Sequence, residues 1–391
     1  MVAITVMIHI FRKHSIQIFL FLFVNALFII KYFPRAGISP VVSLAIYIIF
    51  FLFLVSSFYT FSQKVSEKIF KNAFCGLLII MILAIVGALI TINPYNIRVD
   101  RWSALSFFWD SLLIGKYPYS THTHLSATSY PSPFPLWHII NLPFYLLGEV
   151  GIGLIFFLVL TASSIHLFFK SFRKSFFFLL LLCISPAYWW EVATRSDSLN
   201  NALFVFIIIL WLAKTNRTLT NSFLLITVIC GLVAATRLTA ILPLALYLLK
   251  PYLKLPWRLR IIFPLTILGI FLLIFSPFIF WDTNNWIFFH RNPFMSQADK
   301  GNSYILIFML IVGYFMALKW KNIHQFFYTS SVFIFSFILL SQINLIYHYD
   351  WSKVLFMDHI CDISYFSLML PYCLAYFTSA LRLRELEIEI K

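Results

Sequence analysis

Charged residues are scarce in this sequence. Only 11% of the 391 residues are Asp, Glu, Lys or Arg, whereas 61% are hydrophobic and the mean hydropathy is +0.90. A soluble globular domain carries roughly 25% charged residues, so the composition excludes that class and indicates an integral membrane protein. Acids are the minority among the charges, with 14 Asp and Glu against 29 Lys and Arg, which gives a net charge of +15.

Cysteines, repeats and linkers are also few or absent. The five cysteines lie mostly inside apolar runs at spacings that indicate neither a metal site nor a disulfide framework. The sequence has no internal repeat, no Gly- or Ser-rich linker and no separate soluble domain. No small-residue cleavage site follows the first apolar run, so we expect that run to stay as an anchor. These absences predict one integral-membrane domain over residues 1–391, divided into extra N-terminal helices (1–72), a span with a catalytic outer loop (73–150) and the remaining spans (151–391).

The sequence is rich in long apolar runs. Six approach or reach the roughly 17–25 residues that a transmembrane helix needs; they are residues 16–30, 41–59, 73–92, 151–169, 261–280 and 325–344. Shorter runs lie near residues 176–190, 199–213 and 238–249. We therefore expect an all-α polytopic fold of about twelve transmembrane helices, with amphipathic or re-entrant helices in its first large outer loop.

The positions of Lys and Arg predict the orientation of the spans. Arg12 and Lys13 precede the first apolar run, which places the N-terminus in the cytoplasm. If the short segment 134–147 does not cross, every later basic cluster also lies inside, whereas crossing would move all of them outside. The positive-inside rule thus favours a re-entrant or surface-lying segment and two cytoplasmic termini. Basic residues sorted in this way indicate topology and exclude a nucleic-acid-binding patch.

The positions of the acidic residues support the same topology, separately from the positions of Lys and Arg. All eight aspartates fall on the outer side, where Glu149 and Glu191 join them. Acids contribute little to orientation, so their segregation indicates a working face on that side. We expect an extracytoplasmic active site in a multi-pass protein of a bacterial inner or plasma membrane.

The longest connection between apolar runs, residues 93–150, is the best candidate for the reaction centre. Apolar residues at Leu105, Phe108, Leu112 and Leu113 predict an amphipathic helix over 99–114 that Gly115 ends. Asp100 and Arg101 fall in its first turn, directly after a span. An acid in that position lies at the membrane–water boundary, close to any substrate embedded in the outer leaflet.

Other polar groups of this loop have two interpretations each. Asp100 lies between Arg98 and Arg101, which is the pattern of a surface ion pair as well as of a reaction centre. His122 and His124 alternate like metal ligands, but no third ligand at a fixed spacing accompanies them, so hydrogen bonding in the loop is favoured. A divalent metal is therefore possible but not indicated, and no cofactor is expected.

Charged residues near other apolar runs are further candidates. Arg195 and Arg237 are expensive to place between spans, which indicates a partner or a function for each. For Arg237 the structural interpretation is an ion pair with Asp197 or snorkelling of its side chain to the outer interface, and the functional one is binding of a phosphate. A last outer loop carries Lys353 and the group Asp358, His359 and Asp362, for which a metal site is weakly indicated.

Residues 93–150 resemble the first luminal or periplasmic loop of the C-type (GT-C) glycosyltransferases, which use polyprenyl-phosphate sugars, and in particular its mannosyltransferase-like members. The shared pattern is an acid just after a span, an amphipathic helix and Gly-x-x-Pro-Tyr, here Gly115 to Tyr119, followed by a Tyr-Pro-rich segment and an apolar helix. The resemblance implies that Asp100 is the catalytic base. Three departures are present: the acid follows the third span instead of the first, no Asp-x-Asp occurs at Asp100, and no periplasmic soluble domain follows.

The chemistry of such a transfer needs a single carboxylate. A polyprenyl phosphate leaves as a stabilised anion, so one base for the acceptor hydroxyl suffices, with cations to receive the departing charge. We expect inversion at the anomeric carbon, with the lipid tail between spans and a glycan, lipid or protein as acceptor. The predicted substrate-binding residues are Arg98, Arg101, Tyr119, His122, His124, Arg195, Asp197, Arg237, Arg291 and Lys353.

Three other functions remain open. An O-antigen polymerase or ligase is also multi-span and basic, but its large loop lies later in the chain. A transporter or lipid flippase predicts midplane charges and repeat symmetry, neither of which is evident apart from Arg237. A histidine-based membrane acyltransferase is kept open by His122, His124 and His138.

Overall fold

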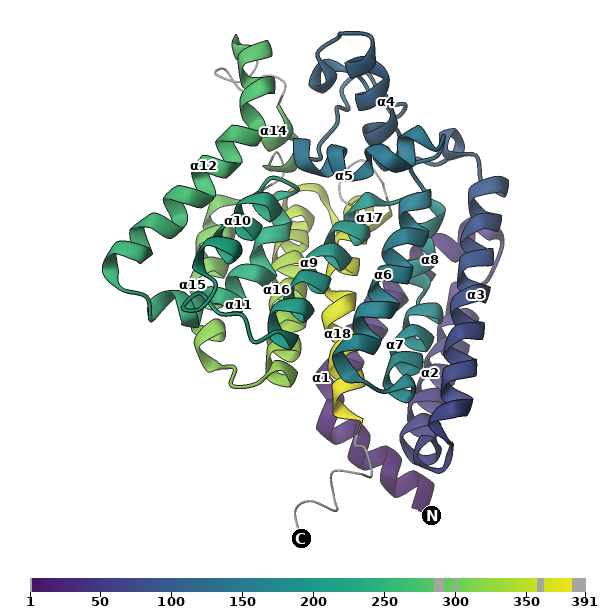
Figure 1. Cartoon of the computed structure of the whole chain (residues 1–391). Helices are drawn as coiled ribbons and strands as arrows, with labels where there is room; N and C mark the ends of the chain where they lie inside the picture. The colour runs from purple at the N-terminus through teal and green to yellow at the C-terminus, as the bar shows by residue number, and fades with distance from the viewer. Residues whose placement is uncertain (1, 285–291, 299–300, 357–361, 382–391) are drawn as a thin grey trace. The chain divides into compact units, whose positions relative to one another are not determined.

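The computed structural model describes residues 2–284, 292–298, 301–356 and 362–381, and the regular structure of these residues is helical (Figure 1). The α-helices are α1 (Val2–Tyr32), α2 (Pro40–Phe61), α3 (Glu67–Thr91), α4 (Arg101–Leu113), α5 (Pro135–Leu146), α6 (Ile152–Phe169), α7 (Phe172–Cys183), α8 (Pro186–Ala193), α9 (Asp197–Lys214), α10 (Phe223–Ala234), α11 (Ile241–Leu253), α12 (Trp257–Trp281), α14 (Pro293–Ala298), α15 (Ser303–Lys319), α16 (Ile323–Tyr349), α17 (Trp351–Phe356) and α18 (Leu370–Ala380).

Seven helices within the described residues are long and apolar enough to cross a membrane. They cover Arg12–Ala36, Pro40–Lys64, Glu67–Thr91, Ile152–Phe169, Asp197–Lys214, Trp257–Trp281 and Ile323–Tyr349, and α7 with α8 forms a bent pair (67°) that would make an eighth. All six long runs expected from the sequence lie in these helices. The fold is thus all-helical and of a polytopic membrane type.

The expected count of about twelve spans is not confirmed. Helices α10, α11 and α15 are apolar but short, with 12, 13 and 17 residues. A helix of 12 residues rises about 18 Å, well short of a hydrocarbon core of about 30 Å. Helix α5 also has 12 residues. That length agrees with the expectation that segment 134–147 does not cross.

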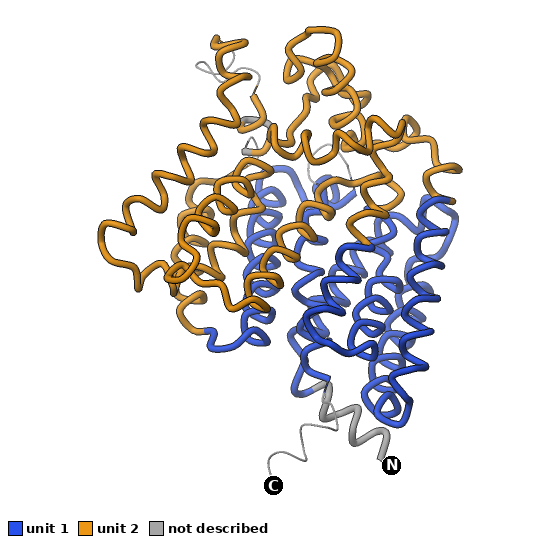
Figure 2. Tube along the Cα trace, viewed as in Figure 1, with its two compact units in different colours: residues 1–86, 159–191, 320–391 blue, residues 87–158, 192–319 orange. Residues whose placement is uncertain are grey.

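The chain divides into two compact units, each built from separate stretches of sequence (Figure 2). Unit 1 comprises residues 1–86, 159–191 and 320–391, and within it α1 packs against α2, α16 and α18. Unit 2 comprises residues 87–158 and 192–319. Within unit 2, α4 packs on α5, α10 on α12, and α11 on α9 and α15. The loop that the sequence marks as the reaction centre belongs to unit 2.

In unit 1 the buried side-chain amide of Asn25 bonds to polar groups at the break between α7 and α8. The side-chain oxygen of Asn25 accepts hydrogen bonds from Ser185 Oγ (2.6 Å) and from the Ala187 backbone N–H (3.2 Å). Asn25 also donates to the carbonyl of Phe21, one turn earlier in α1. Backbone N–H groups at a helix start need such partners when no water reaches them, so Asn25 stabilises the bend in the chain.

Helix α4 confirms the amphipathic helix expected from the sequence, and it ends as expected at Gly115. The Gly115 N–H donates to Leu112 and the Lys116 N–H donates to Ser111, which is the Schellman pattern, and Gly115 has a φ of +74°. Leu105 and Phe108 are buried, but Leu113 is 64% exposed. The assignment of Leu113 to the buried face was therefore wrong, because the final turn of α4 extends beyond the packed aromatic rings.

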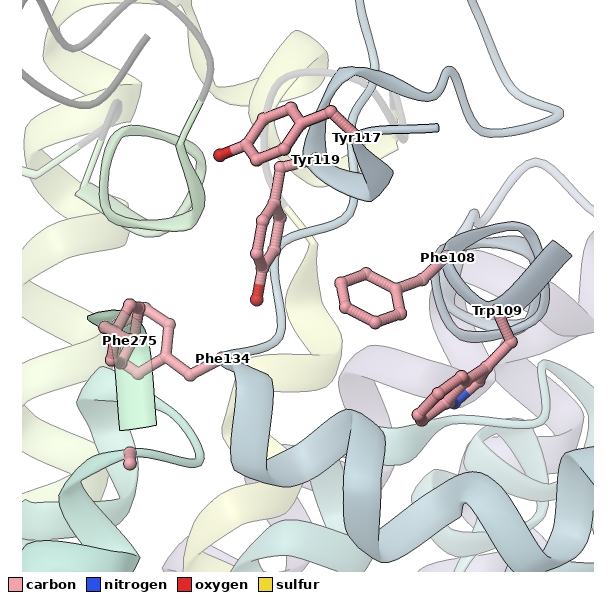
Figure 3. Packing of buried hydrophobic residues seen from close by; sticks show 7 residues of the cluster. Phe108, Trp109, Tyr117, Tyr119, Phe134 and Phe275 are labelled. Atoms are coloured by element: carbon pink, nitrogen blue, oxygen red, sulfur yellow. The ribbon is translucent and has the colours of Figure 1, made fainter. Parts of the chain in front are cut away.

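An aromatic cluster fixes the loop against the rest of unit 2. It consists of Phe108, Trp109, Tyr117, Tyr119, Phe134, Ala235 and Phe275, contributed by α4, the following loop, the start of α5, the end of α10 and α12 (Figure 3). Phe108 meets Tyr119 edge-on at 5.2 Å, and Phe134 meets Phe275 at 5.1 Å. Such edge-to-face pairs contribute about 0.5–1.5 kcal/mol each beyond the area they bury, so the cluster holds α4 firmly.

Candidate active site

Asp100 occupies the N-cap of α4, shortly after α3 ends. Its Oδ2 accepts hydrogen bonds from the hydroxyls of Ser129 and Thr123, the latter at 3.4 Å. Oδ1 accepts none from the described residues, and the side chain is partly exposed. One oxygen of the carboxylate is therefore held in place while the other stays available.

The expected ion pair with neighbouring arginines is not formed within the described part of the chain. Arg98 is exposed, and Arg101 is buried and donates to Ser196 Oγ at the N-cap of α9. The positive charge of Arg101 thus points toward α9, and the carboxylate of Asp100 is held by neutral hydroxyls.

His124 makes hydrogen-bonding contacts with residues on either side of Asp100. Its Nε2 lies 3.1 Å from the carbonyl oxygen of Ile97, which can only accept, so Nε2 carries a proton. Its Nδ1 lies 2.6 Å from Ser103 Oγ, and Ser103 Oγ lies 3.0 Å from the carbonyl oxygen of Asp100. His124 therefore reaches Asp100 through Ser103, whereas His122 is exposed and stands against the ring of Tyr130 at 4.9 Å.

A second polar centre lies deeper in unit 2. Arg237 forms an ion pair with Asp197, to which its Nε and Nη2 both donate at Oδ2, and Trp137 Nε1 donates to the same oxygen at 3.0 Å. All three residues are buried. The structural interpretation of Arg237 as the partner of Asp197 is confirmed. Asp197 Oδ1 has no partner among the described residues.

His138 is fully buried next to this pair. Its ring stacks on Phe108 at 3.5 Å with an interplanar angle of 9°, and neither ring nitrogen meets a described partner in hydrogen-bonding geometry. Burial lowers the pKa of His138 well below its usual range, the positive charge of Arg237 lowers it further, and only the Pro133 carbonyl opposes these effects. Because the ring is fully buried, His138 is not the accessible histidine that the acyltransferase interpretation needs.

Arg195 has internal partners as well. It donates from Nη2 to the carbonyls of Leu89 and Ile92 at the end of α3, both at 2.9 Å, and from Nε to Glu149 at 3.1 Å. Glu149 also accepts from the indole of Trp102 in the first turn of α4. Arg195 thus satisfies the C-terminal carbonyls of α3 and ties that end to α4, in the manner expected of a cation at a helix C-terminus.

The structure describes two of the remaining predicted substrate-binding residues, Tyr119 and Lys353. Tyr119 is 1% exposed and donates to the carbonyl of Pro133 at 3.1 Å; burial first, and the nearby Tyr117 second, raise its pKa. Lys353 is exposed on α17 in unit 1. Arg291, Asp358 and His359 lie outside the described residues.

Three hydroxyl residues around Asp100 were missed by sequence reasoning. Ser103, Thr123 and Ser129 all bond to it or to its backbone. Ser103 follows Asp100 by three positions, which is the spacing of neighbours on a helix and a usable signal. Thr123 and Ser129 come from an irregular stretch whose only signal is its richness in Ser and Thr. No group of three His, Cys, Asp or Glu side chains suited to a metal occurs among the described residues.

Comparison of this chain with known proteins finds no match. No family model matches the chain, and neither the curated proteins nor the solved structures give a match. The fold and composition define an all-helical integral membrane protein, and any functional assignment rests on the residues of this chain.

Proposed function

We propose that the protein is a glycosyltransferase of the GT-C type, which transfers a sugar from a polyprenyl-phosphate donor to an acceptor hydroxyl on the extracytoplasmic face. The observation that carries the proposal is the carboxylate of Asp100. It is partly exposed, lies at the start of an amphipathic helix shortly after the apolar span α3, and has one oxygen fixed by Ser129 and Thr123. A base fixed in this way can take a proton from a substrate without moving.

The reaction balances with this one base. The acceptor hydroxyl loses its proton to Asp100 Oδ1 and bonds to the anomeric carbon as the bond from that carbon to the phosphate oxygen breaks. The electron pair leaves with the polyprenyl phosphate, which is a stable anion and needs no proton from an acid. Attack opposite the leaving group inverts the anomeric configuration.

We assign the cation that binds the phosphate by its nearness to Asp100 along the chain. Arg195 and Arg237 are committed to internal carboxylates, so neither has its full charge available. Arg98 is exposed and two positions from Asp100. A guanidinium is suited to a phosphate because its fork of N–H groups matches two phosphate oxygens. Arg98 is therefore the phosphate-binding residue of the proposal.

The experiment is a transfer assay with the purified full chain and a panel of polyprenyl-phosphate sugars. The proposal expects release of polyprenyl phosphate with at least one sugar, and a product of inverted configuration by NMR. Arg98→Gln should raise KM for the donor, whereas Arg35→Gln, which makes the same change in unit 1, should not. A transporter would release no polyprenyl phosphate, and a polymerase or ligase would turn over only longer lipid-linked glycans; either result contradicts the proposal.

A further inference from the structure

In unit 2, α10, α11 and α12 line a partly open apolar cavity of about 450 Å³. Its lining includes Cys230 of α10, Leu244 and Leu248 of α11, and Phe263 and Ile267 of α12. The cavity lies along α11 from Ile241 to Tyr252, about 16 Å at the rise of an α-helix. A cavity of this size is typical of a ligand site, and its apolar lining suits a hydrocarbon chain.

A basic turn lies next to the end of the cavity that Tyr252 and Phe263 line. It is defined here as Lys250 near the end of α11, Lys254 in the connection, and Arg258 and Arg260 in the first turn of α12. Lys254, Arg258 and Arg260 are exposed. Tyr252 of the cavity wall donates from its hydroxyl to the carbonyl of Arg260 at 3.1 Å, which joins the wall to the turn. Arg260 in turn donates from Nε to the carbonyl of Leu255 at 2.7 Å, so its guanidinium is held in place.

Two further features mark this turn as a membrane–water interface. Trp257, the first residue of α12, is 67% exposed, and the guanidinium of Arg258 lies 5.6 Å from its ring. Tryptophan with basic residues at the end of an apolar span is typical of the headgroup level. No acidic residue occurs in the sequence between Asp197 and Asp282, so no neighbouring carboxylate along the chain neutralises the turn.

We propose that the cavity and the basic turn together bind one anionic phospholipid, with an acyl chain in the cavity and the phosphate against Lys254, Arg258 and Arg260. The apolar wall recognises the chain and the cations recognise the negative headgroup, because charge clusters next to a span attract anionic lipid. Phosphatidylcholine also has a phosphate, but its choline cation cancels the negative charge and is repelled by the basic turn, so a lipid without net charge should bind more weakly.

This lipid is distinct from the sugar donor of the proposed function. Phe278, near the far end of α12, packs against Phe108 of α4 at 5.9 Å. From Arg258 to Phe278 the helix rises about 30 Å, which is about the thickness of the hydrocarbon core. The headgroup site and the α4 site therefore lie at opposite ends of α12, and the lipid site stands whether or not Asp100 catalyses sugar transfer.

The test uses the full chain in a neutral detergent, titrated with phosphatidylglycerol or with phosphatidylcholine of the same acyl chains. Native mass spectrometry measures bound lipid, and thermal unfolding measures stabilisation. Wild type should bind phosphatidylglycerol about thirtyfold to a hundredfold more tightly than phosphatidylcholine, as expected of two or three cations near one anionic headgroup. Equal binding of the two lipids would overturn the proposal.

Variants separate the two halves of the site. R258Q/R260Q should lose the preference for phosphatidylglycerol, whereas K64Q/K68Q, with the same change of charge in unit 1, should keep it. Ala245→Trp, which places a large ring at the lining, should weaken both lipids, whereas Leu224→Trp, on an exposed position of α10 outside the lining, should weaken neither. An unchanged preference in R258Q/R260Q, or unchanged binding in Ala245→Trp, would contradict the proposal, as would displacement of the phospholipid by equimolar polyprenyl phosphate.

Discussion

Ser129 donates a hydrogen bond to Oδ2 of Asp100, which joins the irregular part of the loop to the N-cap residue of its amphipathic helix. The two residues are 29 positions apart, and Pro131, Pro133 and Pro135 follow Ser129 directly. The bond fixes the carboxylate in one orientation while Oδ1 stays open. Its importance for the proposed transfer can be measured separately from that of the carboxylate itself.

Replacing Ser129 should therefore slow transfer without abolishing it. Ser129→Ala removes a hydrogen bond to a charged group, worth about 1.5–3 kcal/mol, so kcat should fall roughly tenfold to a hundredfold. Ser126→Ala is the control, because Ser126 is exposed and its side chain bonds, among the described residues, only to Thr128; its backbone carbonyl, which accepts from the Ser129 N–H, is kept by the substitution. Steady-state kinetics of release of polyprenyl phosphate provides the measurement. Equal rates for Ser129→Ala and Ser126→Ala would show that the hydroxyl does not position the base.

The buried pair of Asp197 and Arg237 should affect stability more than the other ion pairs described here. Arg237→Met leaves the carboxylate of Asp197 buried without its cation, which costs about 3–5 kcal/mol. The double variant D197L/R237M removes both charges and should recover a large part of that loss. The measurement is the thermal stability of wild type, Arg237→Met and D197L/R237M, compared in the same detergent. A double variant less stable than Arg237→Met would contradict the assignment of the pair as mutually compensating.

Stability should fall in mild acid because of His138. The folded state holds the pKa of this histidine well below 6.5, whereas the unfolded chain takes up the proton near 6.5. Below pH 6.5 the unfolded state thus binds more protons, and stability declines by at most about 1.4 kcal/mol per pH unit from this group. Above pH 6.5 the contribution is complete.

The variant His138→Phe separates this effect from other titrations. Phenylalanine keeps the stack on Phe108 and introduces no unpartnered nitrogen, so its melting temperature should drop less between pH 7 and pH 5 than that of wild type. His122→Phe, on an exposed side chain, should follow wild type. An identical pH dependence in His138→Phe and wild type would show that His138 does not govern acid stability.

Sequence reasoning succeeded where the determinant is local. The six long apolar runs became helices because length and hydropathy are properties of each run. The end of α4 followed from Gly115, whose positive φ the Schellman turn requires. The pairing of Arg237 with Asp197 was among the alternatives left open by the sequence, because a cation in an apolar segment needs a partner, and the structure shows it.

The other assignments depended on tertiary contacts that no local pattern encodes. Whether α10, α11 and α15 cross a bilayer depends on a few residues at their ends, so the count of spans was not predictable to within one or two. Arg195 looked free to bind phosphate because the carbonyls it meets, at Leu89 and Ile92, are more than a hundred positions away. Ser129 and Thr123 reach Asp100 through a turn that only the folded loop defines.

The central claim, that Asp100 is the base of a sugar transfer, is tested most directly by one pair of variants. Asp100→Asn keeps the shape of the side chain but removes its basicity, and Asp110→Asn makes the same change on α4 at an exposed residue bonded to Tyr145. In an assay with a polyprenyl-phosphate sugar, Asp100→Asn should lower kcat by about 10²–10⁴-fold while Asp110→Asn stays near wild type. Transfer at the wild-type rate by folded Asp100→Asn would contradict the claim.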